Sequence, residues 1–194
     1  MSQLKMYFLP GTPIKEYPLP EGYSYSGFDP AKDIQAWVEC IQPGLCDGMT
    51  AEAAYQQEIV NFHDIVPEKD IHFLDYNGQH VGTVTTFVFS ESGFGDMHMV
   101  GIRKDFRGKG LAKYLSYIAL KSLAPRNVTV SLTTGEGRVA AVKSYLSAGF
   151  LPVEYAEGMV ERWEKVLAAH HIDHIQMLNE DGSPYKMIYK KESE

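Results

Sequence analysis

The sequence predicts a mixed α/β (α+β) fold, because segments with the two-residue period of strands alternate with segments that have the 3.6-residue period of helices. The clearest strand signal is residues 128–133, where apolar side chains alternate with Ser and Thr. The dipeptide Asn77-Gly78, between two apolar runs, predicts a hairpin turn. The clearest helix signal is the apolar series Leu111, Leu115, Ile118, Ala119 and Leu123.

The first 63 residues predict two strands and two helices. Five of the ten prolines fall within residues 1–30 and exclude a long helix there, so we expect strands over residues 5–9 and 23–28. Asp29-Pro30 has the pattern of an N-cap followed by proline, which predicts a helix over residues 30–41. Pro43-Gly44 ends this helix, and Thr50 is a suitable N-cap for a second helix over residues 50–63.

The remaining elements follow from the same signals. The predicted hairpin joins strands over residues 71–75 and 80–89, and a strand over residues 96–102 leads into a helix over residues 108–123. A helix over residues 138–148 is expected to bury Val139, Val142 and Leu146. The last predicted elements are strands over residues 128–133, 150–155 and 185–190, and a helix over residues 158–170.

Composition limits the class of protein. The length of 194 residues fits one domain, and an apolar fraction of 44% is enough for a core. The chain has no run of 18 apolar residues and no signal-peptide core at its start, which favours a cytoplasmic protein without a membrane partner. The net charge of −7 argues against a nucleic-acid partner and suits a cationic substrate. Cys40 and Cys46 are expected to be reduced thiols.

The segment from Val100 to Lys113 carries the strongest functional signal. An apolar strand runs into a basic turn that contains Gly108 and Gly110 and opens directly into a helix. Five of the 18 Lys and Arg residues lie between Arg103 and Lys113. Free main-chain N–H groups, a helix N-terminus and cations together favour phosphate binding, and glycine lets the ligand approach the backbone. The turn is therefore predicted to be an anion-binding cradle.

Two familiar phosphate loops do not fit this turn. A Walker loop ending at Gly108-Lys109 needs glycine where Arg103 stands and Ser or Thr where Gly110 stands. A dinucleotide-binding fingerprint needs Gly or Ala where Lys113 stands. Both classes are therefore excluded.

The pattern that fits is Arg-x-x-Gly-x-Ala, formed by Arg107, Gly110 and Ala112, which resembles the acetyl-CoA-binding motif of the GNAT superfamily of N-acyltransferases. A second segment, residues 138–150, is similar to the family pattern Asn-x-x-Ala-x-x-x-Tyr-x-x-x-Gly-Phe. It has Arg138 in place of Asn and matches at Ala141, Tyr145, Gly149 and Phe150. The two motifs stand in the order and at the spacing of the family.

The resemblance implies a GNAT-like fold, which is a twisted, mostly antiparallel mixed sheet flanked by helices on both faces. It implies that residues 1–194 form a single acyltransferase domain. Within it, residues 1–30 form an extended aromatic and proline-rich region, residues 96–153 bind acetyl-CoA, and residues 156–194 add a helix and a strand. Arg162-Trp163-Glu164 in that last part resembles a subgroup that includes mycothiol-synthase-like proteins.

The resemblance also implies acetyl-CoA as the acyl donor, without a metal. Main-chain N–H groups of residues 107–112 are expected to hold the pyrophosphate, and Arg138 replaces an Asn that contacts the pantetheine arm. The implied coenzyme-binding residues are Ile102, Arg103, Lys104, Arg107, Gly108, Lys109, Gly110, Leu111, Ala112, Arg138, Ala141 and Ser144.

Direct transfer to an amine, which the resemblance implies, needs a general base. His98 is the leading candidate, because histidine titrates near neutral pH and its position resembles that of a strand histidine in serotonin N-acetyltransferase. Period-two alternation predicts that its side chain shares a face with Val100 and Ile102. Asp96 is the second candidate, as a base or as a substrate anchor, and Glu58 and His63 are weaker candidates. A purely structural histidine is the alternative interpretation.

The other two tasks are assigned by the same resemblance. The main-chain N–H of Ile102 is expected to stabilise the oxyanion. Tyr145 is expected to protonate the leaving thiolate, on a helix face that is offset from the core side chains; the alternative is a tyrosine that only packs.

The sequence leaves the acyl acceptor open. The leading hypothesis is an N-acetyltransferase for a primary amine of a small molecule. A protein or peptide N-acetyltransferase and a non-catalytic acyl-CoA-binding regulatory module are the alternatives, and both a monomer and a homodimer are possible. The histidines His170, His171 and His174 are spaced like metal ligands, but no Glu follows His170 as the helical zinc motif requires, so we expect no metal there.

Overall fold

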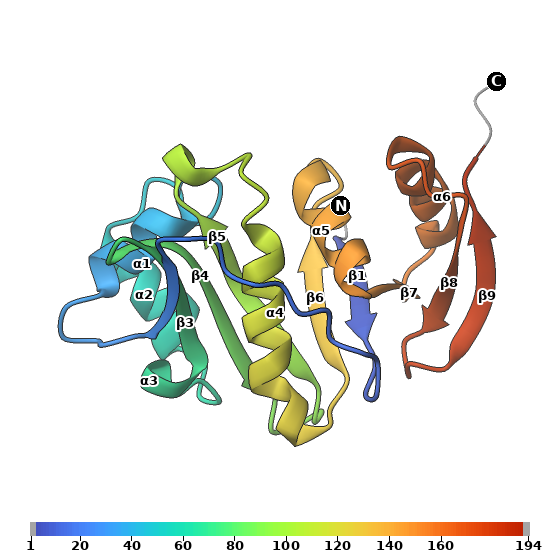
Figure 1. The fold of residues 1–194 in the computed structure, drawn as a ribbon. Helices are drawn as coiled ribbons and strands as arrows, with labels where there is room; N and C mark the ends of the chain where they lie inside the picture. Colours follow the sequence, from blue (N-terminus) through green and yellow to red (C-terminus); the bar gives the residue numbers. More distant parts are fainter. Residues whose placement is uncertain (1–2, 192–194) are drawn as a thin grey trace. The chain divides into compact units, whose positions relative to one another are not determined.

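The structure, a computed structural model, describes residues 3–191 and groups the chain into two units. The central unit runs from Ile14 to Val128. The second unit combines the N-terminal segment, through Pro13, with the segment from Thr129 onward. Figure 1 shows the elements of both units, coloured along the sequence. The N-terminal strand therefore belongs with elements that are distant in sequence.

Four antiparallel strands form the sheet of the central unit. In spatial order they are β2 (Tyr23–Gly27), β3 (Ile71–Tyr76), β4 (Gln79–Val88) and β5 (Gly95–Ile102). The hairpin between β3 and β4 turns at Asn77 and Gly78, whose φ angles of 49° and 79° are those that a two-residue hairpin needs. The sequence prediction of these four strands is confirmed to within two residues at each end.

Helices cover both faces of this sheet, as expected for the fold. The helical elements are α1 (Ile34–Ile41), α2 (Ala51–Tyr55), the π-helical turn η1 (Gln56–Val60), α3 (Pro67–Asp70), the 3₁₀ turns η2 (Lys104–Phe106) and η3 (Ala124–Arg126), and α4 (Ala112–Leu123). Gly101 lies against α1, whereas Gly82 lies against Leu115 of α4. Gly101 pairs with Thr83, the neighbour of Gly82 in β4, so the two glycines mark opposite faces.

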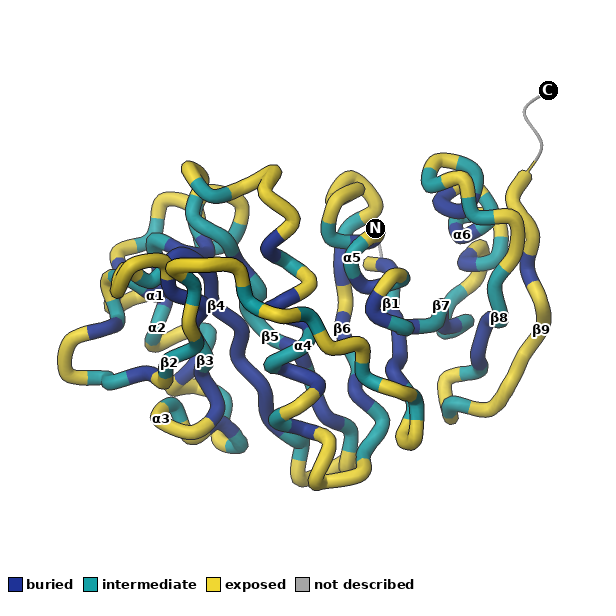
Figure 2. The backbone as a smooth tube through the Cα atoms, viewed as in Figure 1, coloured by how far each residue is buried: buried dark blue, intermediate teal, exposed yellow. Residues whose placement is uncertain are grey.

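The main core of the central unit lies between α1, α2, η1 and the sheet. Trp37, Ile59, Phe73 and Phe87 are each at most 1% exposed there. Figure 2 shows buried backbone along β3 and β4, while the connecting loops are exposed. Burial of these large apolar side chains stabilises the unit.

Three predicted helix boundaries were wrong, each for a local reason. The first helix begins at Ile34 rather than at residue 30, because the Asp29 N–H donates to the Asp33 carboxylate in a preceding turn. The second helix is capped by Thr50 as predicted but becomes π-helical after Tyr55. The third begins at Ala112 rather than at residue 108, because residues 108 and 110 have φ angles of 76° and 71°, which no α-helix accommodates.

The second unit has a mixed five-stranded sheet. In spatial order its strands are β6 (Val130–Thr134), β1 (Leu4–Phe8), β7 (Leu151–Glu154), β8 (His174–Asn179) and β9 (Pro184–Tyr189). β7 and β8 are parallel and the other pairs are antiparallel. β8 was not predicted, because its strand character comes from pairing with β7 and β9 rather than from a local pattern. The helices are α5 (Val139–Ala148) and α6 (Met159–Ala169).

The predicted buried face of α5 was right for Val142, which is buried, but wrong for Val139, which is exposed, and for Leu146, which is half-buried. Val139 is 53% exposed and begins the helix after an exposed turn, where no other element covers it. The buried residues of α5 are Val142, Tyr145 and Ala148. Tyr145 therefore lies within the packed face rather than offset from it.

Among residues 3–191, no helix is both long and apolar enough to cross a membrane.

A polar cluster ties the start of α1 to the β3–β4 hairpin. Nδ1 of His80 lies 2.6 Å from Oδ1 of Asp75, and its Nε2 lies 3.5 Å from Oδ1 of Asp33. The imidazole stacks on Phe73, with ring centroids 3.9 Å apart. Asp33 and Asp75 are 7% and 6% exposed, so their carboxylates need partners to balance the loss of solvation; His80 lies close to both, and Asp33 also accepts from the Asp29 N–H.

We expect Gly101→Ala to lower the free energy of unfolding by about 3 kcal/mol, because the new Cβ meets unyielding backbone atoms. That Cβ would lie 2.5 Å from the carbonyl oxygen of Cys40 and 2.7 Å from Cα of Ile41. Gly27→Ala is the control, since the nearest atom to its Cβ would be 4.0 Å away. Urea denaturation of both variants checks this, and equal stability of the two would contradict it.

We expect His80→Ala to lower the free energy of unfolding by about 3 kcal/mol, because the buried carboxylate of Asp75 loses its close partner. His63→Ala is the control, because His63 lies in an exposed turn and surface substitutions usually change stability by less than about 0.5 kcal/mol. Chemical denaturation gives both values. A loss no larger than that of the control would show that the cluster contributes little.

Candidate functional site

The turn after β5 has the geometry of an anion cradle. Gly108 and Gly110 have left-handed φ angles, and a Cβ on either would point into open space. Within residues 3–191, the main-chain N–H groups of residues 108–111 donate no hydrogen bond to another described residue. Leu111, which is 3% exposed, anchors the end of the turn, and Ala112 begins α4. Unpaired N–H groups at a helix N-terminus attract an anion.

Arg107 braces this turn through its side chain. Its Nε donates to the carbonyl oxygen of Ile102 at 2.8 Å, and its Nη2 donates to that of Pro43 at 2.9 Å. The guanidinium thus links the end of β5 to the segment that follows α1. Because a guanidinium is rigid and always charged, it fixes the path of the chain into the glycines.

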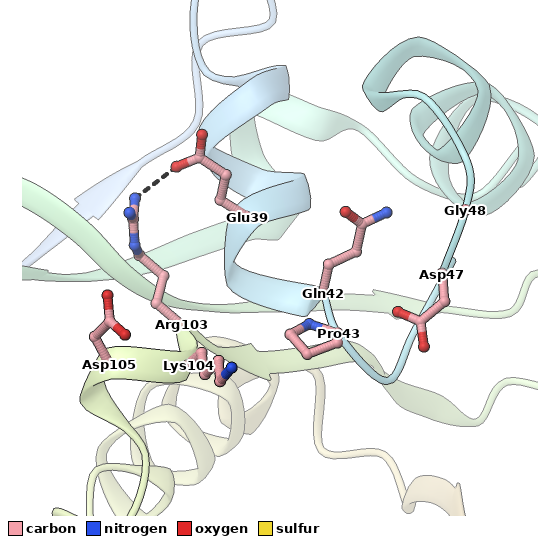
Figure 3. A pocket seen from close by; sticks show the side chains of 8 residues that line it. All are labelled: Glu39, Gln42, Pro43, Asp47, Gly48, Arg103, Lys104 and Asp105. Carbon is pink, nitrogen blue, oxygen red and sulfur yellow. Dashed lines mark hydrogen bonds and ion pairs between the residues drawn. The ribbon is translucent and has the colours of Figure 1, made fainter.

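Arg103 also has a protein partner. Its Nη1 lies 2.6 Å from Oε2 of Glu39 on α1, as Figure 3 shows. The two side chains border an open hollow of about 360 Å³. The hollow is lined by Glu39, Gln42, Pro43, Asp47, Gly48, Arg103, Lys104 and Asp105. Lys104 is exposed at the edge of the hollow and has no ion-pair partner among the described residues, whereas Arg103 is paired with Glu39.

Lys109 projects over an aromatic ring. Its Nζ lies 4.5 Å from the centroid of Phe106, and Phe106 in turn contacts Tyr76 with centroids 5.8 Å apart. The cation–π interaction restricts the position of the Lys109 ammonium and leaves its charge in place. Lys109 therefore adds positive potential beside Gly108 and Gly110.

His98, on β5, contacts the helical segment that covers the sheet. Its Nε2 lies 2.9 Å from the main-chain oxygen of Glu58 and 3.5 Å from Oε2 of the same residue. Its ring packs against Phe62, with centroids 4.8 Å apart, and edge-on to Phe87. Burial lowers the pKa of His98, while the hydrogen bond to Glu58 and the charge of Glu58 act to raise it. Two of the predicted base candidates are thus in contact.

A β-bulge changes the face on which His98 lies. Met99 has a φ of 48°, and the pairing of β5 with β4 shifts between Thr83 and Thr85. His98 pairs with Thr85 and Gly101 with Thr83, so those two residues share a face. The predicted sharing of a face by His98, Val100 and Ile102 was therefore wrong, because the extra residue of a bulge reverses the alternation.

Asp96 and Ile102 occupy different positions relative to this bulge. Asp96 pairs with Phe87 and so lies on the same face as His98, and it is half-buried. The Arg103 N–H donates to the oxygen of Val81, which makes Ile102 and Gly82 a non-hydrogen-bonded pair. The N–H of Ile102 therefore points away from β4.

The second unit holds the other predicted residues. Arg138 is the exposed N-cap of α5, so the predicted helix over residues 138–148 begins one residue later, at Val139. Ala141 and Ser144 are half-buried on α5. Tyr145 is 8% exposed, and its ring packs edge-on against Phe150 with centroids 5.9 Å apart.

Several partners in the central unit were not predicted from the sequence. Glu39 as the partner of Arg103, and the Pro43 carbonyl as an acceptor for Arg107, depend on where α1 ends. A main-chain acceptor has no residue signature, so no sequence signal could have identified it. His63, one of the two weaker base candidates, lies in an exposed turn after η1.

The C-terminal histidines do not lie on one helix. His170 ends α6, His171 has a φ of 57°, and His174 begins β8, so the i, i+4 spacing is not on one helix. No group of three or more His, Cys, Asp or Glu side chains in residues 3–191 is arranged to hold a metal ion.

Comparison with known proteins gives one family. The profile of the acetyltransferase (GNAT) family matches residues 34–150. The chain is 29% identical over 150 residues to the mycothiol acetyltransferase of Streptomyces coelicolor, covering 75% of this chain and 48% of that protein. It is 24% identical over 182 residues to that of Frankia casuarinae, covering 84% and 51%. The chain thus spans about half the length of these relatives.

Solved structures share the fold. A GCN5-related N-acetyltransferase from Sphaerobacter thermophilus superposes with a TM-score of 0.56 at 21% identity, over 78% of this chain and 49% of that one. A diaminobutyrate acetyltransferase from Paenibacillus lautus, solved with L-2,4-diaminobutyric acid and coenzyme A, gives a TM-score of 0.51 at 16% identity, over 64% and 73%. At these identities the likeness establishes the GNAT fold.

We expect Arg107→Gln to lower the free energy of unfolding by about 1 to 2 kcal/mol, because the carbonyl oxygens of Ile102 and Pro43 lose a shared charged donor. Lys121→Gln is the matched control, since its ion pair with Glu16 is exposed and such pairs contribute little. Urea denaturation measures both. A stability equal to that of the control would show that the brace is not needed to hold the turn.

Proposed function

The chain belongs to the acetyltransferase (GNAT) family, and from this we propose that the protein transfers an acetyl group from acetyl-CoA to a primary amine of a small molecule. The observation that carries the proposal is the turn after β5. Its N–H groups at residues 108–111 have no hydrogen-bond acceptor among the described residues, and cations lie beside them. A turn of this kind is suited to the pyrophosphate of coenzyme A.

The residues of the turn fit a diphosphate. A Cβ at Gly108 or Gly110 would meet no protein atom within 4 Å, so glycine there leaves room for a ligand. We assign pyrophosphate binding to the main chain of residues 107–112, with Lys104 and Lys109 supplying charge. Arg103 is engaged by Glu39, and Arg107 acts by holding the loop. We further propose, on the family pattern alone, that the pantetheine part of coenzyme A contacts Arg138, which precedes α5, and Ala141 and Ser144, which lie on it.

The proposed acceptor is a small amine for two reasons. The relatives are named mycothiol acetyltransferases, and a structural neighbour was solved with a diamino acid. The net charge of −7 favours approach of a cation. The chain spans about half of those relatives, so the activity and the acceptor are proposals for this chain.

Three groups are proposed to do the chemistry. His98, or Asp96 on the same face, removes a proton from the ammonium form of the amine, and the nitrogen lone pair freed in this way attacks the thioester carbonyl. The N–H of Ile102, which points away from β4, donates to the oxyanion that forms. The C–S bond then breaks as Tyr145 gives its phenolic proton to the thiolate, and the second proton lost by the nitrogen returns to the tyrosinate. Acetyl-CoA, when bound, supplies the thioester that makes this transfer favourable.

The extent of the functional domain is also part of the proposal. The family match runs from residue 34 to residue 150 and so includes residues of both units. This supports residues 1–194 as one acyltransferase domain, with the coenzyme-binding part over residues 96–153. The cytoplasmic location and the oligomeric state stay predictions.

We expect Tyr145→Phe and His98→Gln each to lower kcat about 100-fold, because general acid or base catalysis is lost. Affinity for coenzyme A, measured by calorimetry, is expected to stay within about twofold in both. Thiol release from acetyl-CoA with a panel of polyamines, amino sugars and diamino acids gives the rates. Tyr185→Phe is the control, because Tyr185 lies exposed on β9.

The alternatives give different outcomes in the same assay. Coenzyme A binding without turnover for any amine or peptide would indicate a binding module. Labelling of peptides but of no free amine would indicate a protein N-acetyltransferase. Absence of any calorimetric signal with coenzyme A or acetyl-CoA would contradict the whole proposal.

A further inference from the structure

His98 and Glu58 meet where two irregular elements face each other. His98 immediately precedes the bulge at Met99 of β5, and Glu58 lies in the π-helical turn η1. Both side chains are 16% exposed, so neither is freely solvated. Bulges and π-turns are often found at functional sites because they re-aim one side chain or carbonyl. The position of the pair between two irregular elements therefore points to a part in the proposed reaction.

The π-turn leaves the Glu58 carbonyl available to His98. The Asn61 N–H bonds the oxygen of Gln56, and the Phe62 N–H bonds that of Ile59, each at 3.1 Å. In a regular α-helix the Phe62 N–H would bond the oxygen of Glu58. Here the oxygen of Glu58 lies 2.9 Å from Nε2 of His98 instead. A carbonyl can only accept a hydrogen bond, so Nε2 must carry the proton.

We propose that Glu58 is a positioning residue for His98, fixing the imidazole with its proton on Nε2 so that Nδ1 is the atom that takes the proton from the amine. The Glu58 carboxylate then stabilises the imidazolium that forms. This inference rests on the proposed function, in which His98 is the base.

The proton transfer balances at named atoms. One N–H bond of the ammonium breaks, an Nδ1–H bond forms, and the electron pair stays on the amine nitrogen for attack. The positive charge moves from the amine to the imidazole. Oε2 of Glu58, 3.5 Å from Nε2, is placed to balance that charge.

The surroundings of His98 make Glu58 its main charged neighbour. From β4 the ring faces Thr85 and Phe87, and from the segment after η1 it faces Phe62, none of which is charged. Asp96 lies two residues earlier on the same face of β5. Burial, followed by the charges of Glu58 and Asp47, raises the pKa of the Cys46 thiol.

The first test measures His98 without turnover. Two-dimensional NMR of ¹⁵N-labelled protein, with His98→Gln to assign the signals, reports which ring nitrogen holds the proton and the midpoint of titration. We expect the neutral ring to be protonated on Nε2. In Glu58→Gln the midpoint should move to lower pH, because the carboxylate no longer favours the charged ring. Glu58→Asp, which keeps the charge, should restore much of the shift, and the exposed Glu52→Gln on α2 should leave it unchanged.

The second test measures coupling in catalysis. We expect Glu58→Gln to lower kcat/KM about tenfold at neutral pH and to move the acidic limb of its pH profile to lower pH. The same substitution in His98→Gln should have no further effect, because Glu58 acts through His98.

A neutral His98 protonated on Nδ1, an unchanged titration midpoint in Glu58→Gln, or additive effects in the double variant would overturn the inference. These outcomes are separable from failure of the proposed function. If no amine is acetylated while the NMR results are as expected, the transfer reaction fails and His98 loses its role as a base, although the pairing itself stands.

Discussion

The close approach of α1 to β5 at Gly101 is the constraint on which the site in the central unit depends. Any side chain at this position would collide with the backbone of Cys40 and Ile41. Because α1 lies directly on the strand, its last turn brings Glu39 to Arg103 and the Pro43 carbonyl to Arg107. These two cations therefore hold the chain in place as it leaves β5, and the N–H groups of Gly108 and Gly110 that follow donate to no described residue.

Irregular backbone appears where the chemistry is proposed, and regular backbone appears where the core is packed. The bulge at Met99 places Asp96 and His98 on the face covered by α1 and η1, and Ile102 beyond the reversal. The π-turn of η1 frees one carbonyl for His98. Between them, the core of Trp37, Phe73 and Phe87 is almost fully buried, which gives both irregular segments a rigid support.

Sequence reasoning succeeded where the signal is local and failed where it depends on distant partners. The hairpin at Asn77-Gly78 and the cap at Thr50 were predicted because the residue types themselves set the backbone conformation. β8 was missed because its strand character comes from pairing with β7 and β9. Burial of Val139 was predicted wrongly because periodicity identifies a helix face but not which end of it another element covers.

By itself, the sequence determined the mixed α/β class, most element positions and the glycine-containing turn, because these follow from periodicity, φ preferences and charge spacing along the chain. Tertiary structure alone decided that Arg103 and Arg107 have protein partners, that a bulge reverses the face of β5, and that Glu58 meets His98. Those results depend on a main-chain acceptor, on a strand register or on an ion pair between side chains far apart in the sequence, and none of these has a local pattern in the sequence that would reveal it.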